Sequence, residues 1–100
     1  MITVRYMQSG NKAAVTFDGH AKYGQPGSDI VCSAVSALYY ALAIGLQKLA
    51  PGSVSTDGKM IELTEITPET KGAMTTVFAG LRAIAETYPD NVTVICPSGV

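Results

Sequence analysis

Hydrophobic and polar residues alternate over the first 20 positions, which is typical of half-buried strands. Residues 2–8 place Ile2, Val4 and Tyr6 on one face. A turn at residues 9–12 separates this run from a second alternating run over residues 13–19, which ends in Gly19. The pattern therefore predicts an N-terminal hairpin.

A long apolar segment after Asp29 predicts a buried helix. Asp29 is a good N-cap residue, and the Pro-Gly pair at residues 51–52 ends the helix. Apolar residues occupy nearly the whole circumference, so we expect burial on two sides, either between the sheet and another helix or against a second subunit. Polar residues interrupt the segment, which favours a buried helix over a membrane span. One apolar stripe at spacings of three and four contains Val31, Val35, Leu38, Leu42, Gly45 and Leu49, and much of the opposite side is apolar through Ile30, Ala34, Ala37, Ala41 and Ile44.

The second half of the chain predicts another hairpin and another helix, followed by a last strand. The Asp-Gly pair at residues 57–58 suits a two-residue type I′ turn, which would place Val54 opposite Ile61. Thr67 caps a second helix with Pro68 at its first position, and residues 92–96 form a last strand. The order β-β-α-β-β-α-β predicts an α+β fold, an α/β sandwich with two helices on a mixed, mostly antiparallel sheet. We expect a single domain over residues 1–100.

Composition narrows the class of protein. The chain has 47% hydrophobic and 15% charged residues and a net charge of −1. Such a balance predicts a folded domain and no nucleic-acid partner, because those binders usually carry a basic excess. One histidine and two cysteines are too few for a closed zinc site, so we expect no metal and no cofactor. The N-terminal residues alternate like a strand and do not have the pattern of a signal peptide. We therefore expect a cytoplasmic protein with reduced thiols.

One segment, residues 19–36, combines residues that can perform chemistry. His20 is the only histidine and lies at the end of a predicted strand, and Cys32 lies three residues after Asp29, in the first turn of the predicted helix. A helix N-terminus and a nearby imidazole both favour the reactive thiolate. Free amides in the same turn can hold the oxyanion of a tetrahedral intermediate. A glycine-containing loop joins the two residues and would let them meet.

Structural explanations compete with this hypothesis. A cysteine in an apolar helix is usually a small core residue, a lone histidine is usually structural, and Asp29 can be a plain cap. The glycine-rich loop also suits phosphate binding, although its glycine spacing matches no known nucleotide-binding motif. Cys96 lies on a strand without a helix dipole or an adjacent base, so we interpret it as structural or incidental.

The motif itself resembles a known family. Gly-His-Ala at residues 19–21 and Gly-Ser-Asp-Ile-Val-Cys-Ser-Ala-Val-Ser at residues 27–36 are similar to the Prp family of bacterial ribosomal-processing cysteine proteases. The resemblance implies that His20 and Cys32 form the catalytic pair and that Asp29 supports them. It also implies a homodimer with an α/β sandwich fold. The Tyr-Tyr pair at residues 39–40 and the tail at residues 96–100 depart from that pattern.

The resemblance also implies a substrate. Family members remove an N-terminal extension from a large-subunit ribosomal protein by cutting after an aromatic residue, a step in ribosome biogenesis, and phage-associated relatives would act on a capsid or scaffold protein. We therefore expect a cysteine endopeptidase with a protein or peptide substrate and no membrane partner. The alternative is a non-catalytic peptide-binding or assembly module with the same fold. The loop residues expected to bind or cover the peptide are Tyr23, Gly24, Gly27 and Ser28.

Overall fold

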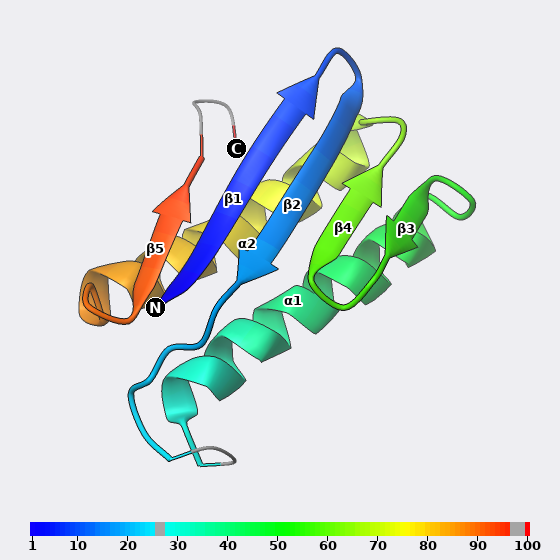
Figure 1. Cartoon of the computed structure of the whole chain (residues 1–100). Coiled ribbons are helices and arrows are strands. Elements are labelled where there is room, and N and C mark those ends of the chain that lie inside the picture. The colour runs from blue at the N-terminus through cyan, green and yellow to red at the C-terminus, as the bar shows by residue number, and fades with distance from the viewer. Residues whose placement is uncertain (26–27, 97–99) are drawn as a thin grey trace.

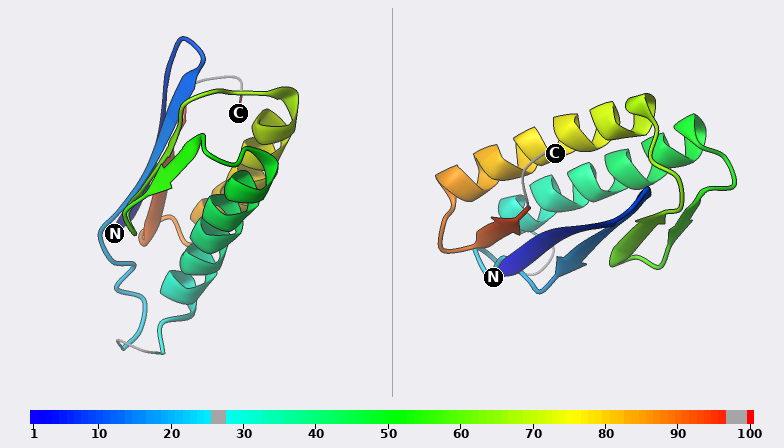
Figure 2. Two further views of the ribbon diagram at one scale, coloured as in Figure 1. Left: turned by 90° about the vertical axis from the view of Figure 1, so that its right-hand side faces the viewer. Right: turned by 90° about the horizontal axis from the view of Figure 1, so that it is seen from above.

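The computed structural model describes residues 1–25, 28–96 and 100. A five-stranded sheet forms one layer, and two helices lie side by side on one of its faces (Figures 1 and 2). This architecture confirms the α+β prediction and the predicted element order. The elements are β1 (Ile2–Ser9), β2 (Lys12–Asp18), α1 (Ile30–Leu49), β3 (Val54–Thr56), β4 (Met60–Leu63), α2 (Pro68–Thr87) and β5 (Val92–Ile95).

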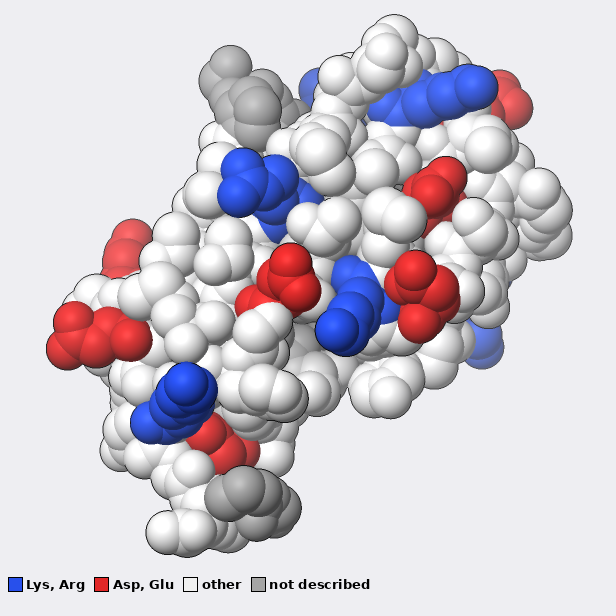
Figure 3. Space-filling view, in the orientation of Figure 1, with Lys and Arg blue, Asp and Glu red and all other residues white. Residues whose placement is uncertain are grey.

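The sheet has the strand order β3-β4-β2-β1-β5. β1 and β5 are parallel, and the other neighbouring pairs are antiparallel. Ile2, Val4 and Tyr6 are buried beneath the helices, which confirms the alternation predicted for β1. The other face of the sheet is open, and basic and acidic side chains are interspersed over it (Figure 3).

The β3–β4 hairpin has a longer turn than the Asp-Gly pair predicts. Val54 pairs with Leu63 and not with Ile61, so the register differs by two residues from the expected one. The cause is the Asp57 carboxylate, whose Oδ1 accepts hydrogen bonds from the amides of Lys59 (3.0 Å) and Met60 (2.7 Å) and so closes a wider loop. A shift of two keeps every side chain on its expected face, because side chains alternate with period two.

α1 is buried on one side only. Asp29 caps it as predicted, and its core stripe runs through Val31, Val35, Tyr39, Leu42, Ala43 and Leu46. Leu49 of the first apolar stripe is 49% exposed and Ile44 of the opposite side is 52% exposed, which corrects the expectation of burial on two sides. The expectation that the sheet and another helix enclose α1 is wrong, because α2 lies beside α1 on the same face of the sheet (Figure 2).

The length and apolarity of α1 alone would suffice to cross a membrane. Its packing against the sheet and α2 is that of a core helix, and such helices pass the same test of length and composition. α2 begins with the predicted Thr67 cap, and the side chain of Thr70 completes a reciprocal capping box. Phe78 and Leu81 of α2 are fully buried in the shared core.

Candidate active site

A glycine with positive φ determines how the chain leaves β2. Gly19 has φ +90°, a conformation that side chains with a Cβ rarely adopt. A Cβ at this position would also collide with the carbonyl oxygen of Met1. The Gly-His pair of the motif therefore has a physical basis, because only glycine allows the chain to turn past the N-terminus and present His20 at the end of the sheet.

Asp29 connects this loop to the start of α1. Its Oδ1 accepts hydrogen bonds from the amides of Val31 (2.9 Å) and Cys32 (3.0 Å), and its Oδ2 accepts from Tyr23 (2.9 Å) and Gly24 (3.1 Å). The side chain is buried, and the amide donors, that of Cys32 foremost, lower the pKa of this carboxyl against the opposing effect of desolvation. One carboxylate thus caps the helix and fixes the loop.

The hydrogen bonds of Asp29 correct one expectation from the sequence. The amides of Val31 and Cys32 are not free to hold an oxyanion, because both already donate to the carboxylate. The same carboxylate occupies the helix N-terminus, where a phosphate would have to bind, and its negative charge disfavours the anion-binding alternative.

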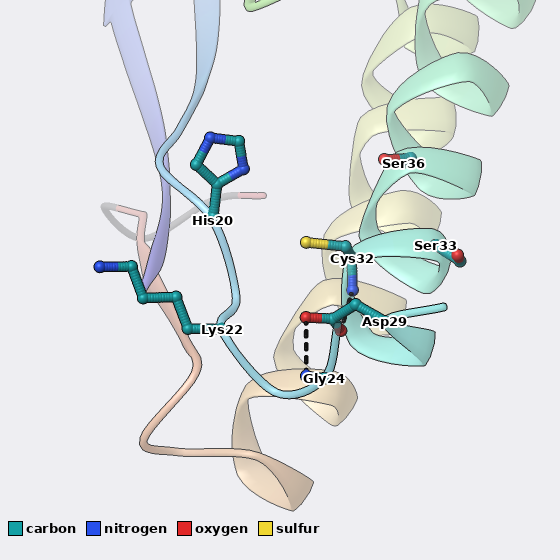
Figure 4. Close-up of a pocket in the computed structure, with 7 residues that line it drawn as sticks. All are labelled: His20, Lys22, Gly24, Asp29, Cys32, Ser33 and Ser36. Atoms are coloured by element: carbon teal, nitrogen blue, oxygen red, sulfur yellow. Dashed lines mark hydrogen bonds between the residues drawn. The ribbon is translucent and has the colours of Figure 1, made fainter. Parts of the chain in front are cut away.

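Cys32 and His20 border the same cavity. This cavity has a volume of about 650 Å³ and is lined by His20, Lys22, Gly24, Asp29, Cys32, Ser33 and Ser36. Figure 4 shows the Sγ of Cys32 pointing toward the loop that carries His20. The amide of Ala21 donates a hydrogen bond to this sulfur at 3.4 Å. Among the hydrogen bonds of the described residues there is none between His20 and Cys32, so the two side chains share a cavity without a hydrogen bond between them.

A second cavity of about 460 Å³ adjoins the first through His20, Cys32 and Ser36. Phe17, Tyr39 and Tyr40 contribute aromatic rings to its wall, and Phe17 and Tyr39 meet edge to face with ring centroids 5.1 Å apart. Sequence reasoning missed this cavity and the contributions of Lys22, Ser33 and Ser36. The Tyr-Tyr pair was a signal, since it departs from the family pattern at this place. The other lining residues are Ile2, Phe17, Asp18, Gly19, Val35, Tyr39, Tyr40, Gly58 and Lys59.

The residues predicted to bind peptide have different positions. Gly24 lines the first cavity. The ring of Tyr23 packs edge to face on Tyr88 at the end of α2, with centroids 5.1 Å apart. Ser28 donates its hydroxyl to the carbonyl of Gln25 and is exposed. Gly27 lies outside the described residues. Lys22 adopts φ +56°, and among the described residues it is the only non-glycine with positive φ.

Cys96 has a different environment from Cys32. It lies just after β5, where burial raises the pKa of its thiol and Arg82 opposes that shift. The two cysteines form no disulfide. Among residues 1–25, 28–96 and 100, no three His, Cys, Asp or Glu side chains cluster closely enough to hold a metal ion.

With this geometry in view, comparison with known proteins identifies the family. The family model described as cysteine protease Prp matches residues 1–93 of the chain. The chain belongs to this family. It is thus a member of a family of cysteine proteases, as the resemblance of residues 19–36 implied.

One curated protein is similar to this chain in sequence, and two solved structures are similar to it in fold. The ribosomal processing cysteine protease Prp of Mycoplasma genitalium is 29% identical over 82 residues, which cover 76% of this chain and 80% of that protein. The ribosomal processing protease Prp from S. aureus, solved with a covalently linked product peptide, has a TM-score of 0.75 at 24% identity and covers 97% of this chain and 100% of that one. SMU.848 from Streptococcus mutans has a TM-score of 0.67 at 29% identity, with 96% and 93% covered.

Proposed function

We propose that this Prp-family chain is an endopeptidase in which Cys32 is the nucleophile and His20 the general base. The observation that carries the proposal is their shared cavity, into which the sulfur points beneath a backbone amide donor. His20 takes the thiol proton, and Sγ bonds to the scissile carbonyl carbon. The C–N bond breaks as His20 protonates the leaving amine. Water then hydrolyses the thioester, and the thiol is restored.

The proposed substrate is an extended peptide at the N-terminus of a large-subunit ribosomal protein or of a related phage structural protein. Relatives named as ribosomal processing proteases support the first, and one of them was solved with a substrate peptide. The second cavity suits an aromatic side chain of that peptide beside the scissile bond, because Phe17 and Tyr39 form an apolar wall next to Cys32. Processing of this kind belongs in the cytoplasm, where thiols stay reduced.

The proposal includes a homodimer formed through the outer face of α1. Ile30 (59% exposed), Tyr40 (60%) and Ile44 (52%) lie along this helix outside the core. Such an apolar face on a small domain is typical of a protein interface. We expect Ile44→Asp to convert a dimer to a monomer in sedimentation velocity experiments, and a parent chain that sediments as a monomer at all concentrations would contradict this part of the proposal.

The catalytic proposal is tested by cleavage of a ribosomal protein that carries its N-terminal extension. We expect Cys32→Ala to lower kcat/KM by at least about 1000-fold and His20→Ala to lower it by roughly 100- to 10,000-fold. Cys96→Ala is the matched control, since it removes the other thiol and should leave the rate unchanged. Mass spectrometry identifies the bond that is cut.

Two outcomes would count against this mechanism. If Cys32→Ala and His20→Ala cleave as fast as the parent chain, neither residue performs the chemistry. If the parent binds the extended protein but cuts no bond, the chain is the non-catalytic peptide-binding module that the sequence left open.

A further inference from the structure

Ala21 lies between His20 and Lys22, and both of its polar backbone groups form hydrogen bonds with side chains. Its N–H donates to the Sγ of Cys32 at 3.4 Å, and its carbonyl accepts a hydrogen bond from the Nδ2 of Asn91 at 2.8 Å. Ala21 is only 1% exposed, so water does not compete for these groups. The direction of the amide that faces the sulfur therefore depends on how the backbone of Ala21 is anchored.

Asn91 is itself fixed by the main body of the fold. It lies between α2 and β5, where its amide donates to the carbonyl of Tyr88 (3.0 Å) and its carbonyl accepts from Ile2 at the start of β1 (2.8 Å). Its side chain then reaches a loop residue 70 positions away in the sequence. Because Asn91 is fixed in this way, its side chain holds the loop in a defined position relative to α2 and the sheet.

We propose that Asn91 is a positioning residue for the candidate active site. By holding the carbonyl of Ala21, it keeps the Ala21 N–H directed at Sγ, where it stabilises the thiolate more than the thiol because hydrogen bonds to charged acceptors are stronger. It also fixes the backbone next to His20. The inference rests on Cys32 being the nucleophile, and it assigns a role to a residue outside the motif.

Asn91 does not titrate, so its effect is measured through Cys32. Iodoacetamide alkylation of Cys32 is followed from pH 5 to pH 10 in a Cys96→Ala background, so that only one thiol reacts. None of the Asn91 variants changes a charged or titratable group around the two cavities that border Cys32. These groups are His20, Lys22, Asp29, Asp18, Lys59, Tyr39 and Tyr40.

We expect Asn91→Ala to move the midpoint of the alkylation curve upward by about one pH unit and to slow alkylation at pH 7 several-fold. In the cleavage assay kcat should fall by about tenfold with KM nearly unchanged, because Asn91 lines neither of the two cavities that border Cys32. Asn91→Leu keeps approximately the same size and adds no charge but has no donor for the Ala21 carbonyl, so it should show the same loss. Asn11→Ala is the control, since this other asparagine lies on the turn between β1 and β2.

The outcomes separate positioning from a structural role. If both Asn91 variants fold with a lower melting temperature but keep the parent's alkylation midpoint and kcat, Asn91 is structural and the inference is overturned. If Asn91→Ala does not fold, the neutral variant Asn91→Leu decides by the same two readouts. The alkylation experiment uses no peptide, so it can fail or succeed independently of the proteolysis proposal. That proposal fails if the parent chain cuts no bond or if Cys32→Ala and His20→Ala still cleave.

Discussion

Two turns of this molecule each combine a glycine with positive φ and an aspartate that accepts backbone amides, yet only one of them carries a candidate catalytic residue. The loop over residues 19–29 and the turn over residues 57–60 each contain a glycine at φ +90° and an aspartate that accepts backbone amides. Asp57 is exposed and accepts two amides within three residues of itself. Asp29 is buried and accepts four, from both sides of the loop and from Cys32.

The difference shows what converts a turn into a site. In the turn over residues 57–60, the aspartate accepts only amides of the turn itself, and Gly58 and Lys59 form part of the wall of the second cavity. In the loop, the same residue types join three separate parts of the chain, namely the end of β2, the start of α1 and the N-terminus. Substitutions at matched positions therefore separate local strain from damage to the site.

The largest effect is expected from the glycine pair. Gly58→Ala should cost about 1–2 kcal/mol of unfolding free energy from positive φ alone, because a Cβ there meets no atom within 4 Å. Gly19→Ala adds a collision with the Met1 carbonyl and should cost about 3 kcal/mol or more, with loss of cleavage. Urea unfolding of the two variants measures the difference. Equal losses would mean that the loop backbone relaxes away from the N-terminus.

The second comparison replaces each aspartate by asparagine. Asn keeps one oxygen to cap α1, but its NH₂ group cannot accept from the amides of Tyr23 and Gly24, so Asp29→Asn releases the loop and leaves the helix cap. We expect cleavage to fall roughly 10- to 100-fold because the side chains that border the cavity lose their alignment. Asp57→Asn should change it by less than about twofold, since surface changes of this kind have small effects. Comparable losses in both variants would show that the loop needs no carboxylate.

How much of the fold could be predicted from the sequence depends largely on how far apart along the chain the interacting residues lie. The alternation of β1, the Thr67 cap and the Asp29 cap are local patterns, and each was predicted correctly. The register of β3 and β4 was wrong because the Asp57 side chain, and not the Asp-Gly pair alone, determines the length of the turn. The exposed side of α1 was as apolar as its buried side, so the sequence could not indicate which side packs on the sheet.

The residues of the candidate site differ in the same way: those close together in the sequence were predicted, and the contacts between distant residues were not. His20, Asp29 and Cys32 were found because they lie within one short motif. The contact between Ala21 and Cys32 spans 11 residues and uses a backbone amide, which leaves no trace in residue identity. The contact of Asn91 with Ala21 depends on the parallel pairing of β5 with β1, and strand order was not predictable from the sequence.

Acid should affect the two aspartates with the same sign and different size. Backbone amides lower the pKa of both carboxyls, with Cys32 the main donor for Asp29 and Lys59 for Asp57. A lowered pKa stabilises the fold above the unfolded value of about 3.9, and this contribution is lost as the pH falls through the folded pKa. Asparagine does not titrate. The melting temperature of the parent minus that of Asp29→Asn should therefore stay constant from about pH 5 to 7 and shrink below about pH 4.

The same difference for Asp57→Asn should be smaller throughout, because fewer amides depend on an exposed carboxylate. Differential scanning calorimetry from pH 2.5 to pH 7 measures both. Parallel curves for the parent and Asp29→Asn over the whole range would show that the ionised form of Asp29 adds nothing to stability.

The smallest expected effect concerns a contact of the loop that involves side chains alone. Tyr23 meets Tyr88 edge to face at 5.1 Å, and Tyr23 is 51% exposed, so the ring pair should contribute no more than about 0.5–1 kcal/mol. Tyr88→Leu keeps apolar volume and removes the ring geometry. The four amide bonds of Asp29 remain, so the melting temperature should fall only slightly, while hydrogen exchange at the Tyr23 and Gly24 amides becomes faster. Unchanged exchange at both amides would mean that the carboxylate of Asp29 holds the loop without help from α2, and a large loss of cleavage would mean that the aromatic contact is the main support of the loop.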